Sequence, residues 1–241
     1  MTGSELRESV TAMVRLVAGA EEAALLGESA SSRARLGSAQ AWTLRATIAH
    51  NTEFKAQQVI RLKAAAERDT PPSFMEIDHS SAEVYQRFSE QSPEEVLSIS
   101  RSTTQELLDR LWELPGAELT DPARNPWLQG RPLWLQVVVR GFWHPGGHLG
   151  EYWLTQGPAP RALRLHRSGV ALAEAMELPG PALGMARYAL ACAEARTGHS
   201  EDALAELRAA LEANPDLAQN ADRDPDLETV RSLPGWASGT G

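Results

Sequence analysis

Three histidines have the side-chain type and the spacing to share one chemical task. His144 and His148 lie four residues apart in the segment WHPGGHLGEYW, and His50 lies far earlier, in WTLRATIAHNTEF. Within a helix, residues four apart project from the same face. Three neutral imidazoles can bind Zn²⁺ or Ni²⁺ and leave a coordination position open, where bound water or a bound thiol loses its proton near neutral pH. One interpretation is therefore a metal site formed by His50, His144 and His148, in which the spacing relates only His144 to His148.

Two glutamates could act beside such a metal. Glu53 falls within an otherwise apolar face of the helix predicted around His50, and Glu151 follows His148 on the inward face of its own helix. A buried carboxylate needs a partner, such as a histidine, an arginine or metal-bound water. We therefore expect Glu53 or Glu151 to serve as a general base or to orient a ligand, with His50 as the third catalytic candidate. The face around Glu53 contains Trp42, Ala46, Ala49, Ala56 and Ile60, with His50 and Gln57 at its edge.

The same histidines also fit a purely structural interpretation. In this alternative, His144 packs at a helix kink, His148 is a hydrogen-bonded core residue and His50 faces solvent. Pro145 favours a kink, because its ring clashes with the carbonyl of Gly141 and it has no N–H to donate. Only the metal site requires all three rings to converge, since Zn–N bonds are about 2 Å long.

Aromatic residues gather in the segment that carries His144 and His148. Aromatic side chains near a pocket suit a flat or apolar ligand. We expect Trp127 and Trp143 to form a wall of a substrate pocket, with Tyr152 and Gln57 as further substrate contacts. The other tryptophans are expected in the core.

The remaining reactive side chains fit structural roles. Asp78 and His79 are expected to form a polar pair in a loop. Cys192 is the only cysteine, so the chain can form no internal disulfide, and its Ala-rich surroundings predict a small core residue. His166 and His199 are expected at the surface.

The elements that must position these residues are predicted to be helices. Strand-like alternation is nearly absent, and Ala, Leu, Glu and Arg dominate the sequence. Ser92-Pro93-Glu94-Glu95 has the pattern of a capped helix start. Long helices in this order predict an all-α, up-and-down four-helix bundle. The expected long helices cover residues 4–26, 42–68, 92–113 and 133–156, and a short helix is expected at 82–89. Residues 115–132 are expected to form a proline-rich loop that would serve as a lid or a pocket wall.

The sequence changes in character after Gly157. Ala-rich helices are predicted at residues 161–176, 182–197 and 200–213, separated by Pro179-Gly180-Pro181 and by Gly198. We therefore predict one domain over residues 1–157 and a second over residues 158–241.

The first 157 residues resemble the DinB-like superfamily of four-helix bundles. The resemblance lies in the second helix, which begins at a tryptophan and carries a histidine in WTLRATIAHNTEF, and in the paired histidines of HPGGHLGEYW. It implies that His50, His144 and His148 bind a divalent metal. Family members include transferases that attach a small cellular thiol to an electrophile, and hydrolases that open the strained rings of genotoxic natural products. Pro145-Gly146-Gly147 departs from the family pattern and favours a metal-free, water-based site.

The segment ARYALACAEARTGHSEDALAELRAALEANPDL resembles a single helical hairpin of tetratricopeptide type. Small residues at Ala191, Gly198, Ala203 and Ala210 would let two antiparallel helices approach closely. One hairpin is too short for an independent solenoid, so we expect it to be a structural partner of the bundle. Recognition of a protein partner is the alternative role.

Composition narrows the function classes. A formal charge of −9 without a basic run argues against nucleic-acid binding. No apolar run approaches the roughly 20 residues that a membrane span needs, and acids stand where a signal peptide has its basic flank.

We expect a cytoplasmic enzyme that adds water or a small thiol to an electrophilic small molecule, in detoxification or antibiotic self-resistance. A non-catalytic protein that sequesters a drug-like ligand is the second hypothesis, and an adaptor that uses the C-terminal hairpin is the third.

Overall fold

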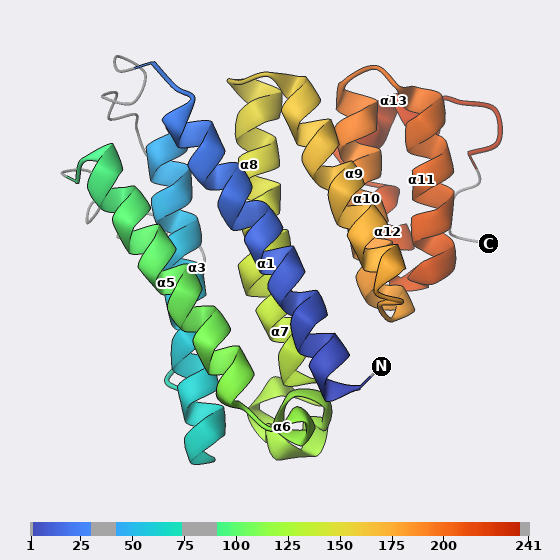
Figure 1. Cartoon of the computed structure of the whole chain (residues 1–241). Helices are drawn as coiled ribbons and strands as arrows, with labels where there is room; N and C mark the ends of the chain where they lie inside the picture. Colours follow the sequence, from blue (N-terminus) through green and yellow to red (C-terminus); the bar gives the residue numbers. More distant parts are fainter. Residues whose placement is uncertain (1, 30–41, 74–90, 237–241) are drawn as a thin grey trace. The chain divides into compact units, whose positions relative to one another are not determined.

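The computed structural model describes residues 2–29, 42–73 and 91–236 (Figure 1). Within these ranges every regular element is a helix, as the composition predicts. The chain divides into two compact units, Met1–Leu149 and Gly150–Gly241. The predicted helix at residues 82–89 and the pair Asp78–His79 lie outside the described residues.

Side-chain caps determine where the long helices of the first unit begin. At the start of α5 (Pro93–Glu113), the hydroxyl of Ser92 accepts from the N–H of Glu95, and the Glu95 carboxylate accepts from the N–H of Ser92. Thr2 and Glu5 make the same reciprocal pair at α1 (Gly3–Leu26). Each pair satisfies backbone donors that have no partner within a helix. The capped start predicted at Ser92 is therefore confirmed.

The helices of the first unit pack alongside one another (Figure 1). The second long helix, α3 (Leu44–Glu67), contacts α5 on one side and a π-helical turn, η3 (Val139–Trp143), on another. That turn joins α7 (Leu133–Val138) to α8 (His144–Thr155), so residues 133–155 form one continuous helical segment. α1 contacts both α5 and η3. The core between them is apolar and includes Met13, Val14, Ile48, Leu62, Leu107, Leu111, Val137 and Leu149.

Pro145 is accommodated by the π-helical turn that precedes it. The N–H of His144 donates to the carbonyl of Val139, five residues back, which widens the helix before the proline ring. Gly141 within this turn permits close packing, because a Cβ there would lie 2.8 Å from Cγ2 of Val14. The expected distortion is therefore a local π turn, and α8 continues regularly through His148.

The proline-rich segment before α7 is not the plain loop that its composition predicts. It contains α6 (Gly116–Thr120) and the 3₁₀ turns η1 (Pro122–Arg124) and η2 (Pro126–Leu128). Pro122 and Pro126 each open one of these turns, where the missing N–H costs nothing. Buried Asn125 then donates to the carbonyl of Glu118 at 3.0 Å, which ties the turns together.

The second unit is built around α10 (Gly180–Arg196), which packs on both α9 (Ala159–Ala175) and α11 (Ser200–Ala213). Ala191, Ala203 and Ala210 are buried as the sequence predicts. The segment after α11 contributes four short helical elements: η4 (Pro215–Leu217), α12 (Ala218–Ala221), η5 (Pro225–Leu227) and α13 (Glu228–Arg231). The core of this unit joins α10, α11 and that segment through Ala191, Ala195, Ala203, Leu204, Leu207, Ala221, Leu227 and Val230.

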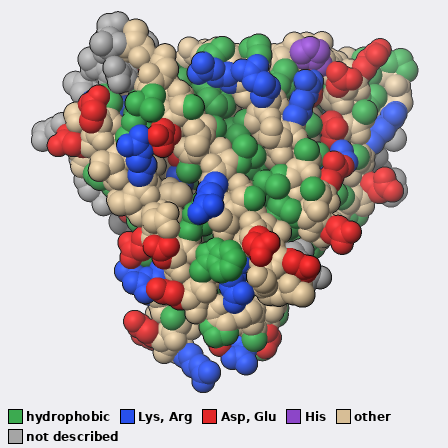
Figure 2. Space-filling view, viewed as in Figure 1, with side chains coloured by type: hydrophobic (Ala, Val, Ile, Leu, Met, Phe, Trp, Pro, Cys, Tyr) green, Lys and Arg blue, Asp and Glu red, His purple; other side chains and the backbone are tan. Residues whose placement is uncertain are grey.

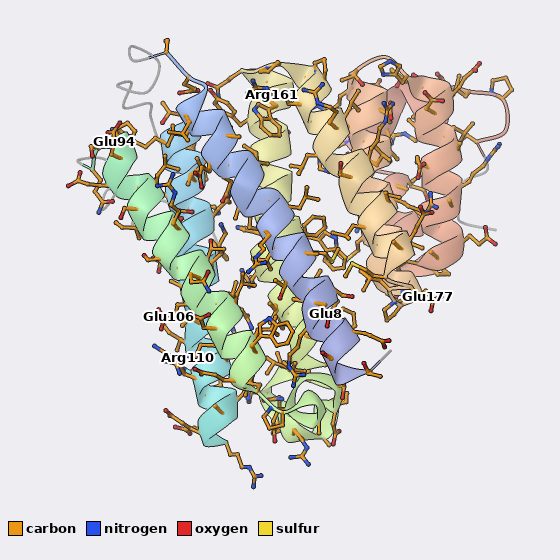
Figure 3. All side chains as sticks on the ribbon, viewed as in Figure 1. Glu8, Glu94, Glu106, Arg110, Arg161 and Glu177 are labelled. Atoms are coloured by element: carbon orange, nitrogen blue, oxygen red, sulfur yellow. The ribbon has the colours of Figure 1, made fainter. Side chains whose placement is uncertain are left out.

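Charged residues of both signs are interspersed on the face shown in Figure 2. Glu8, Glu94, Glu106 and Arg110 are among those that project outward from the helices (Figure 3). Glu106 lies 2.8 Å from Lys63, and both side chains are exposed. Among the described residues, no helix has the length and apolar character required to cross a bilayer.

Candidate metal centre

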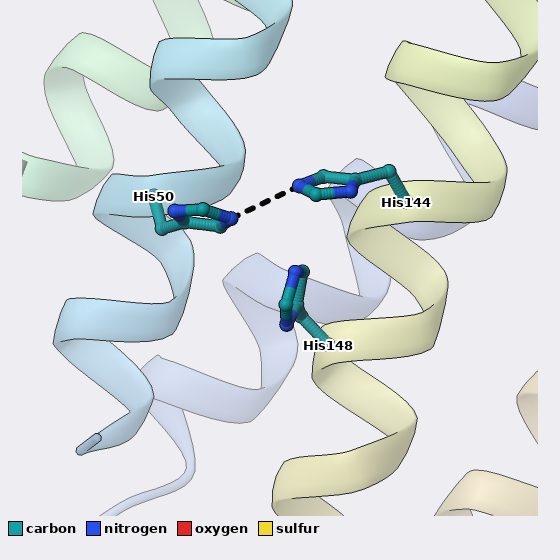
Figure 4. A group of neighbouring side chains, drawn as sticks. All are labelled: His50, His144 and His148. Atoms are coloured by element: carbon teal, nitrogen blue, oxygen red, sulfur yellow. Dashed lines mark hydrogen bonds between the residues drawn. The ribbon is translucent and has the colours of Figure 1, made fainter. Parts of the chain in front are cut away.

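The three histidines converge between α3 and α8 (Figure 4). The Nε2 atoms of His50 and His144 are 3.0 Å apart. One ring nitrogen from each of the three residues lies within 4.8 Å of the other two. His50 is only 1% exposed, so the alternative in which it faces solvent is wrong.

These distances fit a shared ion. Two nitrogens bound to one ion at about 2.0–2.1 Å lie about 3.3 Å apart at a tetrahedral angle, and about 2.9 Å apart at a right angle. The 3.0 Å between the Nε2 atoms of His50 and His144 falls within this range. A ring nitrogen of His148 lies within 4.8 Å of both. The donor set also fits, since imidazoles suit Zn²⁺ and Ni²⁺.

His50 and His144 are held neutral, which is the form that binds metals. Burial, then the nearby His148 and Arg140, lower the pKa of His50 from 6.5 to about 3. Burial is also the main cause that lowers the pKa of His144 to about 2, followed by His148, His50 and Arg140. The lone pairs of both rings are therefore available at neutral pH.

Aromatic rings orient the histidines. The ring of Trp42 lies 4.7 Å from that of His50 and 5.8 Å from that of His148, between centroids. Phe54 lies 4.7 Å from His50 and 4.1 Å from His144 by the same measure. A ligating histidine usually donates a hydrogen bond from its other nitrogen, but Nδ1 of His50 has no such partner among the described residues. Ring packing supplies the orientation instead.

Phe54 was missed by the site prediction, although its position one turn after His50 is a usable signal. Trp42 was identified only as the start of its helix. Both lie against the histidines in the structure.

A buried polar network lies directly beside the site, and nothing in the sequence pattern identified it. The ammonium of Lys55 donates to the Glu21 carboxylate at 2.7 Å, and neither side chain is appreciably exposed. Asn51 donates to the other Glu21 oxygen at 2.7 Å and to the carbonyl of Pro145 at 3.2 Å. Asn51 follows His50 and Pro145 follows His144 in the chain. The network therefore ties α1 and α3 to the backbone that carries the first histidine of α8.

The position of Glu53 differs from the prediction. Its predicted face is the less buried side of α3, since Ile60 is 41% exposed and Ala46, Glu53 and Ala56 are only half-buried. The polar side chains of Asn51, Lys55 and Gln58 occupy the core side instead. Counting apolar residues therefore selected the wrong face. Gln57 is buried on the same side of α3 as His50 and Phe54.

Glu151 is also oriented differently from the prediction. It projects into solvent from the part of α8 that belongs to the second unit, and its carboxylate pairs with Arg196 of the same unit. Its expected inward orientation is wrong, because the buried side of this helix does not continue to Glu151.

The three predicted aromatic contacts lie in different places. Trp143 ends η3 next to His144 and is half-buried. Tyr152 is half-buried on α8 beyond the histidines. Trp127 lies in η2, within the group of short turns around α6 that packs against the start of α1. Trp143 thus adjoins His144 in the chain, whereas Trp127 lies in a turn of the segment that contains α6.

The other histidines and Cys192 are separate from this site. His166 is partly buried rather than at the surface, since a Cβ on Gly150 would lie 2.5 Å from its Nε2 atom, and burial lowers its pKa to about 4. His199 is exposed as expected and lies 3.4 Å from Glu194. Cys192 packs at the edge of the second core, where burial, followed by Asp224, raises the pKa of its thiol.

Comparisons of the chain with protein-family models, with curated proteins and with solved structures found no match. The assignment of a function therefore depends on the chemistry of the three-histidine site.

Proposed function

We propose that the protein is a metal-dependent enzyme that adds water or a small thiol to an electrophilic small molecule. The observation that carries this proposal is the convergence of three histidines, with the Nε2 atoms of His50 and His144 at 3.0 Å and one ring nitrogen from each residue within 4.8 Å of the other two. Two of these rings have strongly lowered pKa values, because they are buried. Neutral imidazoles at these distances suit a divalent cation.

The proposal includes the fold assignment. We assign α1, α3, α5 and the α7–α8 segment to a four-helix bundle of DinB-like type, and α10–α11 to a hairpin of tetratricopeptide type. The order of the helices and the placement of one histidine on the second and two on the fourth support the first assignment. The small buried residues between α10 and α11 support the second.

Each residue has a defined part in this function. His50, His144 and His148 would hold a Zn²⁺ or Ni²⁺ ion. When bound, the ion would supply a Lewis acid that lowers the pKa of water or of a thiol. Trp42 and Phe54 exclude bulk water from the rings and offer an apolar contact to the electrophile. Glu53, half-buried and three residues after His50 on α3, would accept a proton in the reaction.

One observation favours a second candidate, a binding protein without catalysis. A distance of 3.0 Å between two imidazole nitrogens is also that of a direct hydrogen bond. In a metal-free protein, this bond would hold the rings together, and the site would sequester its ligand unchanged.

Turnover separates the two candidates. The purified protein, loaded with Zn²⁺ or Ni²⁺, is incubated with an epoxide or an N-alkyl aziridine, with and without added cysteine as the thiol, and products are counted by mass spectrometry. The enzyme forms many ring-opened molecules per chain, and His144→Gln abolishes this, whereas the exposed control His199→Gln does not. At most one molecule bound per chain, recovered intact, contradicts the enzyme and favours sequestration.

A further inference from the structure

Beyond the histidines, the face of α3 that carries His50 and Phe54 continues with two polar residues, Gln57 and Arg61. His50, Phe54, Gln57 and Arg61 lie at spacings of four, three and four residues, which places them along one side of the helix. Arg61 lies three turns beyond His50, about 16 Å along the axis. The face therefore extends from the metal centre towards a positively charged group.

Arg140 meets this face from the π-helical turn. Its guanidinium carbon lies 4.7 Å from the centre of the Phe54 ring. The same ring lies 4.1 Å from His144 between ring centroids. Phe54 thus contacts both the Arg140 cation and the metal centre, and π-helical turns commonly occur at functional sites.

Arg140 has no anionic partner in the described part of the chain. Its Nε is buried and makes no hydrogen bond there, and no described carboxylate forms an ion pair with it. Trp143, which ends the same π-helical turn, carries a second buried donor, Nε1, that also lacks an acceptor among the described residues. Buried N–H donors without acceptors cost free energy, and a charged one costs more. A bound anion would satisfy the Arg140 donor.

A second cation adds to the positive charge. Burial, followed by the charge of Arg140, lowers the pKa of Arg61 to about 10, so the two guanidinium groups are close enough to repel each other. Both remain charged at neutral pH. The charge of Arg61 therefore adds to the positive potential around Arg140, whose guanidinium donors match carboxylate oxygens.

We propose that Arg140, supported by Arg61, binds a carboxylate on the small molecule whose reacting atom lies at the histidines. The proposal deepens the function proposed above and rests on it: the substrate or the thiol is an organic acid, with its carboxylate and its reacting group separated by a short apolar segment that passes Phe54. Neutral electrophiles and neutral thiols of the same length would then be poor ligands.

Cobalt-loaded protein tests this directly, because thiolate binding to Co²⁺ is visible as a charge-transfer absorption band. The probes are 3-mercaptopropionate and 6-mercaptohexanoate, each compared with the mercapto-alcohol of equal length. We expect at least one acid to bind about 10- to 100-fold more tightly than its alcohol, the gain of a charge-assisted contact. Arg140→Gln should reduce this preference to less than about threefold and leave the affinity of the alcohol unchanged. Equal affinity of acid and alcohol in the wild type overturns the proposal for the thiol.

The source of the carboxylate is tested separately with the electrophile. The affinities of an epoxy acid and its alcohol are compared by competition. 5,6-Epoxyhexanoate and 5,6-epoxyhexan-1-ol are the competitors, and the loss of the Co²⁺–thiolate band measures their binding. Preference for the epoxy acid alone assigns the carboxylate to the electrophile, and preference for the mercapto acid alone assigns it to the thiol. No preference in either series overturns the proposal.

Three variants control the result. Arg131→Gln removes an exposed arginine just before α7 and should retain the full preference for acids. Arg140→Lys preserves the positive charge and should retain part of the preference for acids. Arg61→Gln gives an independent reduction should Arg140→Gln fail to fold, as judged by circular dichroism.

Failure of the metal centre is distinguishable from failure of the carboxylate site. If Co²⁺ does not bind, the proposed function is wrong. Binding of hexanoate and hexan-1-ol to the metal-free protein, followed by tryptophan fluorescence, then tests Arg140 alone. Preference for hexanoate that is lost in Arg140→Gln supports the carboxylate site, and equal binding of the two overturns it.

Discussion

The Nζ atom of Lys55 lies 2.7 Å from a carboxylate oxygen of Glu21, with 0% and 1% of the two side chains exposed. Each charge is therefore compensated mainly by the other. Asn51 donates to the Glu21 carboxylate at 2.7 Å, and Lys55 donates to the hydroxyl of Thr104 at 3.4 Å. Because Asn51 also holds the carbonyl of Pro145, this pair supports the backbone on which His144 is mounted.

Removal of one partner should be far more costly than removal of both. We expect Lys55→Met to lower the free energy of unfolding by about 3–5 kcal/mol, since it leaves the Glu21 carboxylate buried and unpaired. The double variant Lys55→Met with Glu21→Leu should recover a large part of that loss. Urea denaturation of both variants measures the difference. Lys63→Met, which breaks the exposed pair with Glu106, is the matched control and should cost less than about 1 kcal/mol. A similar loss for Lys63→Met and Lys55→Met would contradict this account.

The lowered histidine pKa values predict acid sensitivity of the metal-free protein. The pKa is about 3 for His50 and about 2 for His144 in the folded chain, against 6.5 for the ordinary group. At a pH between these values, the unfolded chain binds more protons than the folded chain. The free energy of unfolding is therefore highest above about pH 6.5 and decreases as the pH falls below that value. The upper limit of the loss is about 1.4 kcal/mol per pH unit for each ring.

Unfolding free energies measured between pH 7.5 and pH 5 test this slope. His50→Gln should reduce the slope of the unfolding free energy against pH by the contribution of one imidazole. The same change at His199, which is exposed, serves as the control and should leave the slope intact. Identical slopes for the wild type and His50→Gln would mean that the His50 ring is not held neutral by burial.

Glu53 gives a prediction about activity rather than stability. If its carboxylate accepts a proton in the reaction, Glu53→Gln should reduce kcat about 10²- to 10⁴-fold. Because Glu53 is only half-buried, the free energy of unfolding should change by less than about 1 kcal/mol. Steady-state kinetics and urea denaturation give both quantities, with Glu106→Gln as an exposed control. Turnover equal to that of the wild type would assign Glu53 a structural hydrogen bond.

Local signals in the sequence predicted the helices well. The capped start at Ser92 and the terminators after residue 68 act through backbone groups within one turn, so they can be identified without knowledge of the fold. The His144–His148 spacing is equally local. Convergence with His50 depends on which helices are neighbours, and the resemblance to a family of bundles, rather than the spacing itself, supplied that expectation.

The contacts across helices could not be predicted. α3 is buried on two sides, against α5 and η3, and much of its core side is polar because Lys55 and Asn51 have partners on other helices. An apolar face therefore indicated the wrong orientation for Glu53. The contact between Arg140 and Phe54 was missed for the same reason, since it joins segments far apart in the sequence.

The central claim, that three histidines bind one metal ion, is tested most directly by titration of the metal-free protein with Zn²⁺ in a calorimeter. The account predicts one ion per chain for the wild type and for His199→Gln. It predicts an affinity at least about 100-fold lower for His50→Gln, His144→Gln and His148→Gln, each of which removes one ligand. A wild-type protein that binds Zn²⁺ no more tightly than these three variants would contradict the metal centre.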